Sequence, residues 1–233
     1  MNVVITGASR GIGKAIAMEF ASHGHDLFLS ATNEKKLQQV NEEISKAFPS
    51  VKVSYAVADL SNKEETMGLG NKIIDAFSIV DVLINNAGTF EPGSVHNEAD
   101  GLLESQVNTN LYSAYHLTRT LLPSMMKKRN GHIFNMCSIA SLTAYDNGGA
   151  YSISKSALLG FSRNLREEMK PHNIKVTAIM PGAVMTDSWG NFDNSSHRIM
   201  EASDVAKMIY ACTQLSAGAC VEEILIRPQL GDL

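Results

Sequence analysis

The sequence predicts an α/β protein in which helices cover both faces of one parallel β-sheet. Apolar, β-branched runs that are typical of buried strands alternate with amphipathic helical segments from end to end. A glycine-rich turn directly follows the first of these runs, and the 233 residues with 44% apolar side chains suffice for one core of this kind. Because strand-helix-strand units form parallel sheets, we expect residues 1–233 to fold as a single doubly wound domain.

Composition and charge exclude several classes of protein. The net charge is −4 and the densest basic run is Lys127-Lys128-Arg129, so nucleic acid is not an expected partner. No apolar stretch approaches the roughly 20 residues of a membrane span, and the N-terminus lacks the pattern of a signal peptide. The 3 cysteines and 7 histidines have neither disulfide nor metal-ligand spacing. We therefore expect a cytoplasmic protein with no membrane partner and no metal.

The first strand, residues 2–6, runs directly into a turn with the spacing Gly-x-x-x-Gly-x-Gly. An amphipathic helix over residues 12–22 follows, and the free amides at a helix N-terminus attract phosphate. Glycines in such a turn let the backbone approach a pyrophosphate closely. This context favours a dinucleotide site over a purely structural turn. The residues expected to bind the cofactor here are Gly7, Ser9, Arg10, Gly11, Ile12 and Gly13.

The second strand, residues 26–30, ends beside the position that distinguishes NAD from NADP. An acid there binds the ribose 2′-hydroxyl of NAD and repels a 2′-phosphate, but this chain has Ala31-Thr32-Asn33. Arg10 offers a cation for a 2′-phosphate, and Thr32 offers a hydroxyl. Glu34 is better placed in the first turn of the next helix, where an acid suits the helix dipole. These residues favour NADP(H) over NAD(H).

The ends of the third and fourth strands supply further candidate ligands. A helix over 34–47 and a strand over 51–57 lead to Asp59, which can bind the adenine amine or cap the next helix, residues 63–77. The fourth strand, residues 80–84, runs into small and amide residues that allow close approach to a ribose. The cofactor ligands expected from these two turns are Asp59, Leu60, Asn86, Ala87 and Gly88.

The long helix predicted over residues 102–128 contains a flaw. Asn108 and Asn110 are poor helix formers, and Pro123 predicts a further break. An interruption near residues 108–110 can expose a backbone carbonyl to water, which makes it a candidate site. The alternative is a simple junction between two helices.

Residues 132–137 are expected to form a strand that ends at Ser138, before a helix over 151–169. Tyr151 and Lys155 lie four residues apart and therefore share one face of that helix. A cation held close to a tyrosine favours its ionised form, so the pair can exchange a proton near neutral pH. By itself the Tyr-x-x-x-Lys pattern is common, and an exposed tyrosine beside a solvated lysine is the alternative.

The last part of the chain completes the alternation. A strand over 174–180 leads into Pro181-Gly182-Ala183-Val184-Met185-Thr186. The polar, irregular residues 187–202 are expected to form a short substrate lid. Ser203 is expected to cap a helix that extends to about residue 215, and a final strand covers 223–227.

Taken together, five motifs resemble the short-chain dehydrogenase/reductase family, in the right order and over nearly the whole chain. They are the glycine turn, Asn85-Asn86-Ala87-Gly88, Ser138, Tyr151-x-x-x-Lys155 and Pro181-Gly182. The resemblance implies a Rossmann fold with seven parallel strands in the order 3-2-1-4-5-6-7. It also implies hydride transfer between a nicotinamide and an alcohol or carbonyl carbon, and assembly as a homodimer or homotetramer.

The resemblance also implies roles for individual residues. Tyr151 becomes the general acid/base, Lys155 the cation that lowers the Tyr151 pKa and holds the nicotinamide ribose, and Ser138 the hydroxyl that orients the substrate oxygen. Asn110 matches the fourth active-site residue better than Asn108, with its carbonyl binding a water that links Lys155 to solvent. The remaining cofactor-binding residues implied are Tyr151, Lys155, Pro181, Gly182, Val184 and Thr186, the last of which matches a carboxamide contact.

The expected activity is reduction of a 3-oxoacyl or other small ketone substrate with NADP(H). Ala31-Thr32 and Arg10 are similar to the corresponding residues of NADPH-using β-ketoacyl-carrier-protein reductases. The ending Glu222 to Leu230 lacks a Gly-Gly pair and is more similar to 3-hydroxy acid dehydrogenases and sepiapterin-type reductases, which leaves the substrate open. An NAD-dependent alcohol or 3-hydroxy acid dehydrogenase and a catalytically silent NADP-binding regulator are the alternatives. The complete set of four catalytic residues argues against the regulator.

Overall fold

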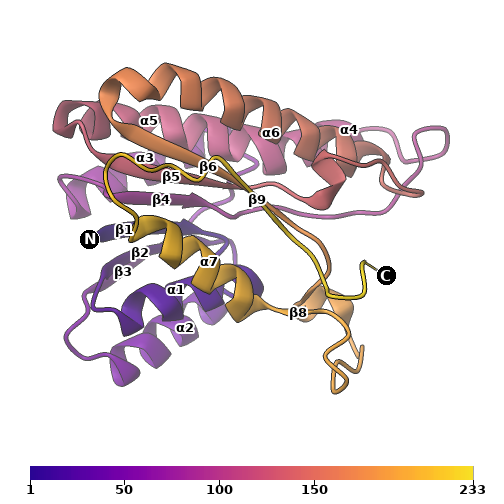
Figure 1. Cartoon of the computed structure of the whole chain (residues 1–233), viewed down its shortest axis with the longest axis horizontal. Helices are drawn as coiled ribbons and strands as arrows, with labels where there is room; N and C mark the ends of the chain where they lie inside the picture. The colour runs from indigo at the N-terminus through magenta and orange to yellow at the C-terminus, as the bar shows by residue number, and fades with distance from the viewer. Residues whose placement is uncertain (233) are drawn as a thin grey trace.

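The protein is built around one seven-stranded parallel sheet, seen between two groups of helices in Figure 1. The computed structural model describes residues 1–232, without the side chain of Ser188. In sheet order the strands are β3 (Val53–Val57), β2 (Asp26–Ala31), β1 (Asn2–Thr6), β4 (Val82–Asn85), β5 (Gly131–Met136), β6 (Ile174–Pro181) and β9 (Glu223–Ile226). Counted along the chain, this is the predicted order 3-2-1-4-5-6-7, so the predicted doubly wound Rossmann fold is confirmed.

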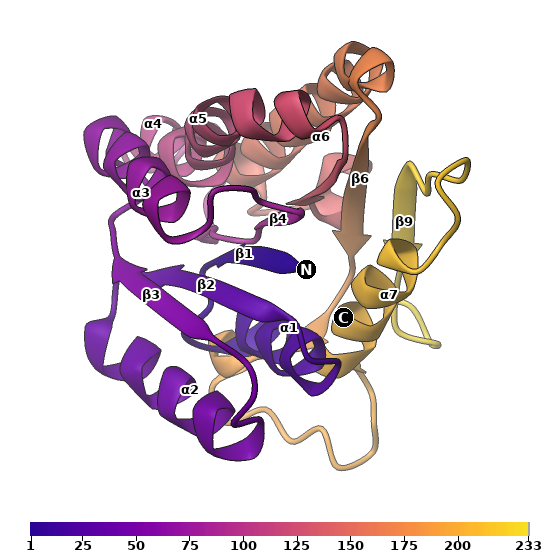
Figure 2. The ribbon, with the colours of Figure 1, turned by 90° about the vertical axis from the view of Figure 1, so that its left-hand side faces the viewer.

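Helices lie on both sides of the sheet, as Figure 2 shows from the end of the molecule. One side carries α1 (Gly11–Ser22), α2 (Glu34–Ala47) and α7 (Ala202–Thr213). The other side carries α3 (Lys63–Ala76), α4 (Leu102–Val107), α5 (Ser113–Lys128) and α6 (Gly149–Met169). Alternate strand residues point to opposite faces, so Val3 and Ile5 join the core on the first side and Val4 joins the core on the second. The sheet is therefore buried on both faces.

Two helices continue through residues that are poor helix formers. Pro123 lies inside α5 without ending it, so the predicted break there is wrong. Proline removes one N–H from the helix, but the buried Leu121 and Met125 on either side keep α5 packed against its core. Gly70 lies in the middle of α3, where a Cβ would come within 2.5 Å of the Thr120 side chain on α5. That glycine permits the close approach of two helices.

Two helix caps also differ from the prediction. Asn62 caps α3 by accepting a hydrogen bond from the Glu65 amide, at 3.0 Å, so Asp59 is not the cap. Helix α7 is capped by Glu201, whose amide in turn donates to Asp204, rather than by Ser203. In both cases another polar residue in the same turn has the geometry to reach the free amides.

The flaw in the long helix is a π-helical turn, Asn108–Tyr112, between α4 and α5. In this turn each backbone hydrogen bond reaches back five residues instead of four, so the Ser113 amide bonds to the Asn108 carbonyl. The Thr109 carbonyl accepts the Ser113 hydroxyl instead, at 2.5 Å. The predicted interruption at residues 108–110 is therefore present, and it turns Asn110 into the protein interior, where it is 1% exposed.

The segment expected to form a lid lies beyond the carboxyl ends of the strands. A small parallel ladder joins β7 (Val184–Met185) to β8 (Met200–Glu201), so the last residues of the predicted 187–202 segment belong to β8 and α7. The irregular part is residues 187–199. Within residues 1–232, no helix is long and apolar enough to cross a bilayer.

Candidate active site

Two turns at the carboxyl end of the sheet are hydrogen-bonded to each other. The Thr6 hydroxyl at the end of β1 accepts the amides of Asn86 and Ala87, at 3.0 and 2.9 Å. The Asn86 side-chain amide returns to the carbonyls of Thr6 and Gly7, at 3.0 and 3.2 Å. Asn86 therefore positions the glycine turn, a task that the sequence did not indicate.

The glycines of the first turn are required by close approach. Gly7 and Gly11 have positive φ angles of 64° and 53°, which side chains rarely tolerate. A Cβ on Gly13 would lie 2.2 Å from the Gly7 carbonyl oxygen and 2.6 Å from Asn86 Nδ2. The turn leads into α1 from Arg10, which has extended backbone and no side-chain cap. The free amides at this helix start can thus face an anion.

Helix α6 presents Tyr151 in its first turn. The helix has no cap of its own, but the Glu98 carboxylate accepts the Ala150 amide, at 3.1 Å, from the loop that follows β4. A carboxylate at this end complements the helix dipole. The Tyr151 ring meets the Phe90 ring edge to face, with centroids 5.0 Å apart. Glu98 and Phe90 thus hold Tyr151, and sequence analysis missed both because they are distant in the chain.

Lys155 lies buried on the same face of α6, one turn after Tyr151. Its Nζ donates to the Met136 carbonyl at the end of β5, at 2.8 Å, and lies 5.8 Å from the centre of the Tyr151 ring. A Cβ on Gly88 would approach Lys155 Nζ to 3.2 Å and Asn110 Oδ1 to 2.8 Å. The predicted Tyr151-Lys155 pair therefore shares one site with Gly88 and Asn110.

Ser138 follows β5 and is connected to α6 through Ser141. The Ser138 hydroxyl accepts the Ala140 amide, at 3.1 Å, which leaves its own proton available for another acceptor. The Ser138 amide donates to the Ser141 hydroxyl, and that hydroxyl donates to the Lys155 carbonyl, at 2.9 Å. Burial raises the pKa of the neighbouring Cys137 thiol to about 11, so this thiol is neutral at pH 7.

Asn110 reaches the same helix through a second serine. Its Nδ2 donates to the Ser154 hydroxyl, at 2.9 Å, and Ser154 donates to the Tyr151 carbonyl, at 2.8 Å. Its Oδ1 accepts the Thr89 amide, at 2.8 Å. The π-turn, the loop after β4 and α6 are thereby held together. The structure thus gathers Asn110, Ser138, Tyr151 and Lys155 around the carboxyl ends of β4 and β5, with Ser141 and Ser154 as connecting residues that sequence analysis missed.

A cationic pocket of about 220 Å³ lies between the glycine turn and the start of α2. Its lining includes the predicted Ser9, Arg10 and Gly11, together with Lys14 and Lys36, which sequence analysis did not single out. Asn33 caps α2 by accepting the Lys36 amide, at 2.9 Å, and this cap fixes Lys36 in the first turn beside Arg10. Glu34 begins α2, as predicted. The cations suit a phosphate bound close to the glycine turn.

The other predicted cofactor residues occupy the same edge of the sheet. Asp59 accepts the amide and hydroxyl of Ser61, and Leu60 is buried beneath it. The carboxylate of Asp232 accepts the Ala183 amide, at 2.9 Å, and packs directly on Gly182. The C-terminal tail therefore covers the Pro181–Thr186 turn, a contact that the sequence did not suggest.

Comparison with known proteins shows the family to which this chain belongs. The family model described as short chain dehydrogenase matches residues 1–196. The chain belongs to the short-chain dehydrogenase/reductase family. It is 30% identical to the sepiapterin reductase of Chlorobaculum tepidum, covering 99% of this chain and 97% of that protein. It is 34% identical to the nodulation protein G of a Rhizobium species, covering 88% of this chain and 82% of that protein.

Solved structures of short-chain dehydrogenases agree with this fold. A metagenomic short-chain oxidoreductase in complex with NADP is 30% identical, with a TM-score of 0.86 and coverage of 98% of this chain and 97% of that one. An alcohol dehydrogenase from Thermococcus sibiricus complexed with 5-hydroxy-NADP is 26% identical, with a TM-score of 0.92 and coverage of 100% and 98%. The resemblance inferred from the sequence is confirmed.

Proposed function

We propose that this short-chain dehydrogenase/reductase is an NADP(H)-dependent reductase of small ketones. The observation that carries the proposal is the paired arrangement at one edge of the sheet. At the carboxyl ends of β4 and β5 lie the four residues Tyr151, Lys155, Ser138 and Asn110. Beside the glycine turn is a pocket that is lined by Arg10 and Lys36. A site with four linked catalytic residues supports turnover. The cations of the pocket, together with Thr32 in place of an acid at the position after β2, support binding of a 2′-phosphate.

When bound, NADPH supplies the hydride that adds to the carbonyl carbon. The Tyr151 hydroxyl supplies the proton to the carbonyl oxygen, which Ser138 also orients with its free hydroxyl proton. Lys155, held on the Met136 carbonyl, places a positive charge beside Tyr151. Asn110 holds the start of α6 through Ser154 and, with its own carbonyl, is proposed to hold a water that returns a proton toward Lys155.

The remaining predicted ligands are proposed to surround the cofactor. The glycine turn holds the pyrophosphate, Asp59 and Leu60 flank the adenine, and Asn86 to Gly88 flank a ribose. The Pro181 to Thr186 turn contacts the carboxamide. Arg10, Lys36 and Thr32 hold the 2′-phosphate, and the segment that begins at Asp187 closes over the substrate.

The side of the site that faces the substrate is apolar and acidic. Residues 89–101 and 139–150 contain four carboxylates and no lysine or arginine. The single cation of residues 187–199, Arg198, is bound to the carbonyls of Gly231 and Asp232. Large apolar side chains are exposed there: Phe90, Val95, Leu142 and Tyr145. These properties favour a neutral 3-oxo ester or aromatic ketone over a negatively charged acyl thioester.

We further propose that the protein assembles as a homodimer or homotetramer. Tyr112 and Ile153 are about half exposed on the π-turn and on α6. Large apolar side chains on an exposed helical surface are typical of subunit contacts.

Oxidation of NADPH with a substrate panel tests the proposed function. The panel contains ethyl acetoacetate, acetoacetyl-coenzyme A, an α-diketone, an aromatic aldehyde and sepiapterin, each with NADPH and with NADH. We expect turnover with NADPH, and the neutral ester to exceed the charged thioester. Turnover with NADH alone would instead support an NAD-linked dehydrogenase. Binding of NADPH without turnover in either direction would support a silent regulator.

A further inference from the structure

The cations of the proposed 2′-phosphate pocket already have a partner, and it comes from the lid. The Asp187 carboxylate lies 3.4 Å from Lys36 Nζ and 3.8 Å from Arg10 Nη1. All three side chains are about half exposed, at 51%, 48% and 58%. Asp187 is 151 residues from Lys36 in the chain, so this contact joins the lid to the start of α2.

We infer that Asp187 is an internal competitor of the 2′-phosphate, so that NADP(H) displaces it and frees the near end of the lid, whereas NAD(H) leaves the lid tethered. This inference rests on the proposed function and adds a residue that sets cofactor discrimination. One carboxylate and one phosphate cannot both approach the same two cations without repelling each other. The phosphate carries more charge and accepts more hydrogen bonds, so it replaces the carboxylate.

The pocket contains an instructive contrast to Asp187. Lys14 also lines it and is paired with Glu43, at 2.6 Å. Glu43 lies in the regular helix α2, so its backbone is fixed by helical hydrogen bonds. Asp187 begins a short 3₁₀ turn, Asp187–Trp189, on an irregular segment. Of these two carboxylates, Asp187 is the one whose backbone can move away from the pocket.

The far end of the lid is held independently. Asn194 bonds through its side chain to both the amide and the carbonyl of Ile199, at 3.0 and 3.1 Å. Arg198 donates to the carbonyls of Gly231 and Asp232 in the C-terminal tail. Loss of the Asp187 contact therefore loosens the near end of the lid, where the Trp189 bond to the Val184 carbonyl remains, while the far end stays attached.

Trp189, the single tryptophan of the chain, reports on this movement. It lies two residues after Asp187, its Nε1 donates to the Val184 carbonyl at 2.8 Å, and its ring packs against Phe192 at 5.4 Å. Release of Asp187 changes the surroundings of this ring. Its fluorescence can be followed without a substrate and without turnover.

The test compares adenosine 2′,5′-bisphosphate with AMP, which lacks only the 2′-phosphate, as ligands of the full-length protein. Affinities come from calorimetry, and the lid is followed by Trp189 emission. We expect Asp187→Asn to tighten the bisphosphate about three- to tenfold, as expected for the loss of two exposed competing ion pairs, and to leave AMP unchanged. The bisphosphate should shift Trp189 emission in the wild type, and the Asp187→Asn protein should show the shifted emission without ligand.

Two matched variants separate displacement from a general effect of charge. Asp193→Asn removes another lid carboxylate, one that accepts hydrogen bonds from Ser195, and should change neither affinity. Glu43→Gln removes the other carboxylate of the pocket and should leave Trp189 emission unchanged. In a Lys36→Met background the gain from Asp187→Asn should shrink, because a double-mutant cycle isolates the pair.

The outcomes distinguish the inference from the proposed function. A wild type that binds the bisphosphate no better than AMP would overturn the NADP preference and this inference with it. A wild type that prefers the bisphosphate, with Asp187→Asn leaving both its affinity and Trp189 emission unchanged, would overturn the inference alone.

Discussion

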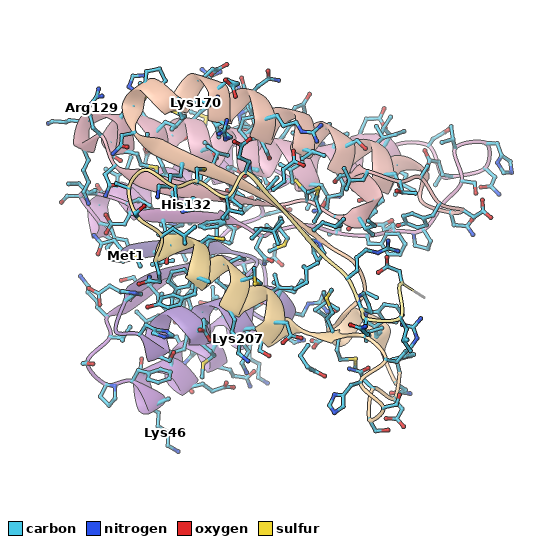
Figure 3. The ribbon with its side chains drawn as sticks, viewed as in Figure 1. Met1, Lys46, Arg129, His132, Lys170 and Lys207 are labelled. Atoms are coloured by element: carbon cyan, nitrogen blue, oxygen red, sulfur yellow. The ribbon has the colours of Figure 1, made fainter. Side chains whose placement is uncertain are left out.

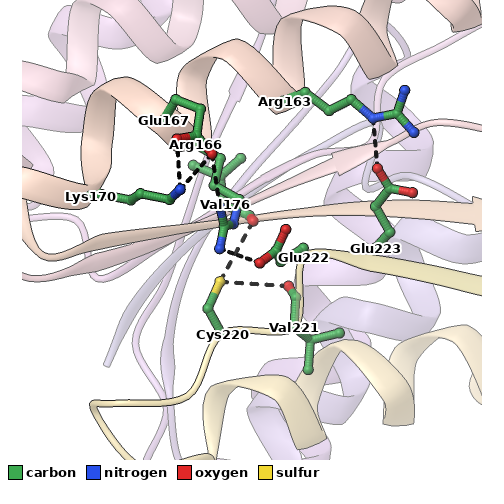
Figure 4. Close-up of polar contacts among 9 residues, drawn as sticks. All are labelled: Arg163, Arg166, Glu167, Lys170, Val176, Cys220, Val221, Glu222 and Glu223. Atoms are coloured by element: carbon green, nitrogen blue, oxygen red, sulfur yellow. Dashed lines mark hydrogen bonds and ion pairs between the residues drawn. The ribbon is translucent and has the colours of Figure 1, made fainter.

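The two ends of the sheet carry similar charges but hold them differently. At the carboxyl end, Arg10 and Lys36 pair with Asp187 from the proposed lid. At the amino end, a pocket of about 240 Å³ is lined by three cations, of which Arg166 pairs with Glu167, at 3.0 Å, and with Glu222. Figure 4 shows the ion pairs of Arg166 and Lys170 in this second cluster, and Figure 3 places Lys170 and His132 on the side of the molecule away from the lid.

The difference lies in the partners of the cations. At the amino end, Lys170 pairs with Glu167 three residues away on α6, and Lys175 donates to the Ser216 carbonyl, at 2.8 Å. These partners lie within or beside regular elements, so the cluster fastens α6 to the strand edge. At the carboxyl end the partner lies on an irregular segment. We therefore propose that the ability of the counter-ion to leave is what distinguishes the ligand pocket from the structural cluster.

The largest effect is expected from a substitution that tests whether catalysis depends on the carboxyl end of the sheet. Tyr151→Phe removes the proposed proton donor and keeps the ring that packs against Phe90. We expect kcat to fall by about 10²- to 10⁴-fold, with NADPH affinity nearly unchanged. Single-turnover kinetics and calorimetry measure the two quantities, and wild-type turnover in this variant would contradict the role of Tyr151.

The amino end should instead govern acid stability. Burial, together with the nearby Lys175, lowers the pKa of His132 to about 3, and its Nε2 lies 2.7 Å from the Thr177 hydroxyl. Because the folded pKa is depressed, the stability from neutral His132 is complete above about pH 6.5 and is lost as the pH falls toward 3. At pH 4.5 the loss is about 2–3 kcal/mol.

Urea unfolding at pH 7.5 and 4.5 measures this term. His132→Gln keeps an N–H donor but does not titrate, so its free energy of unfolding should fall less between the two pH values than that of the wild type. Its kcat at pH 7.5 should match the wild type, because His132 lies near the amino end of β5, whereas the proposed active site lies at the carboxyl ends of the strands. An equal pH dependence in the two proteins would show that His132 does not stay neutral in the folded state.

The smallest effects are expected when one arginine at each end of the sheet is replaced by methionine. Arg166→Met should change NADPH affinity and kcat very little and cost about 1 kcal/mol or less of stability. Arg10→Met should weaken NADPH about tenfold and NADH hardly at all. Similar effects of the two substitutions on NADPH affinity would erase the proposed distinction between the ends.

The sequence predicted the fold well because local patterns decide it. Apolar strand runs, the glycine turn and the alternation of strands with helices are all readable within short windows. Its errors concern Pro123 and Ser203, where tertiary packing or a neighbouring polar residue decides the outcome. A propensity cannot show which of several polar residues reaches a helix amide.

The candidate site was predictable where its residues form spaced motifs. Tyr151, Lys155, Ser138 and Asn110 belong to such motifs, and the structure brings them together. Glu98, Asp187 and Asp232 do not, because each acts across a gap of tens to more than a hundred residues on a group that no local pattern predicts. Side chains that support a site from distant loops require the folded chain to be found.

The hydrogen bonds between Thr6 and the turn after β4 have a consequence for the thermodynamics of binding. Because Thr6 and Asn86 fix both turns in the free protein, the floor of the cofactor cleft has little conformational entropy left to lose. The entropic cost of association then falls mainly on the cofactor itself, because we infer that its 2′-phosphate releases the near end of the lid. The cofactor therefore meets a floor that is already formed, and the release of a short segment follows binding.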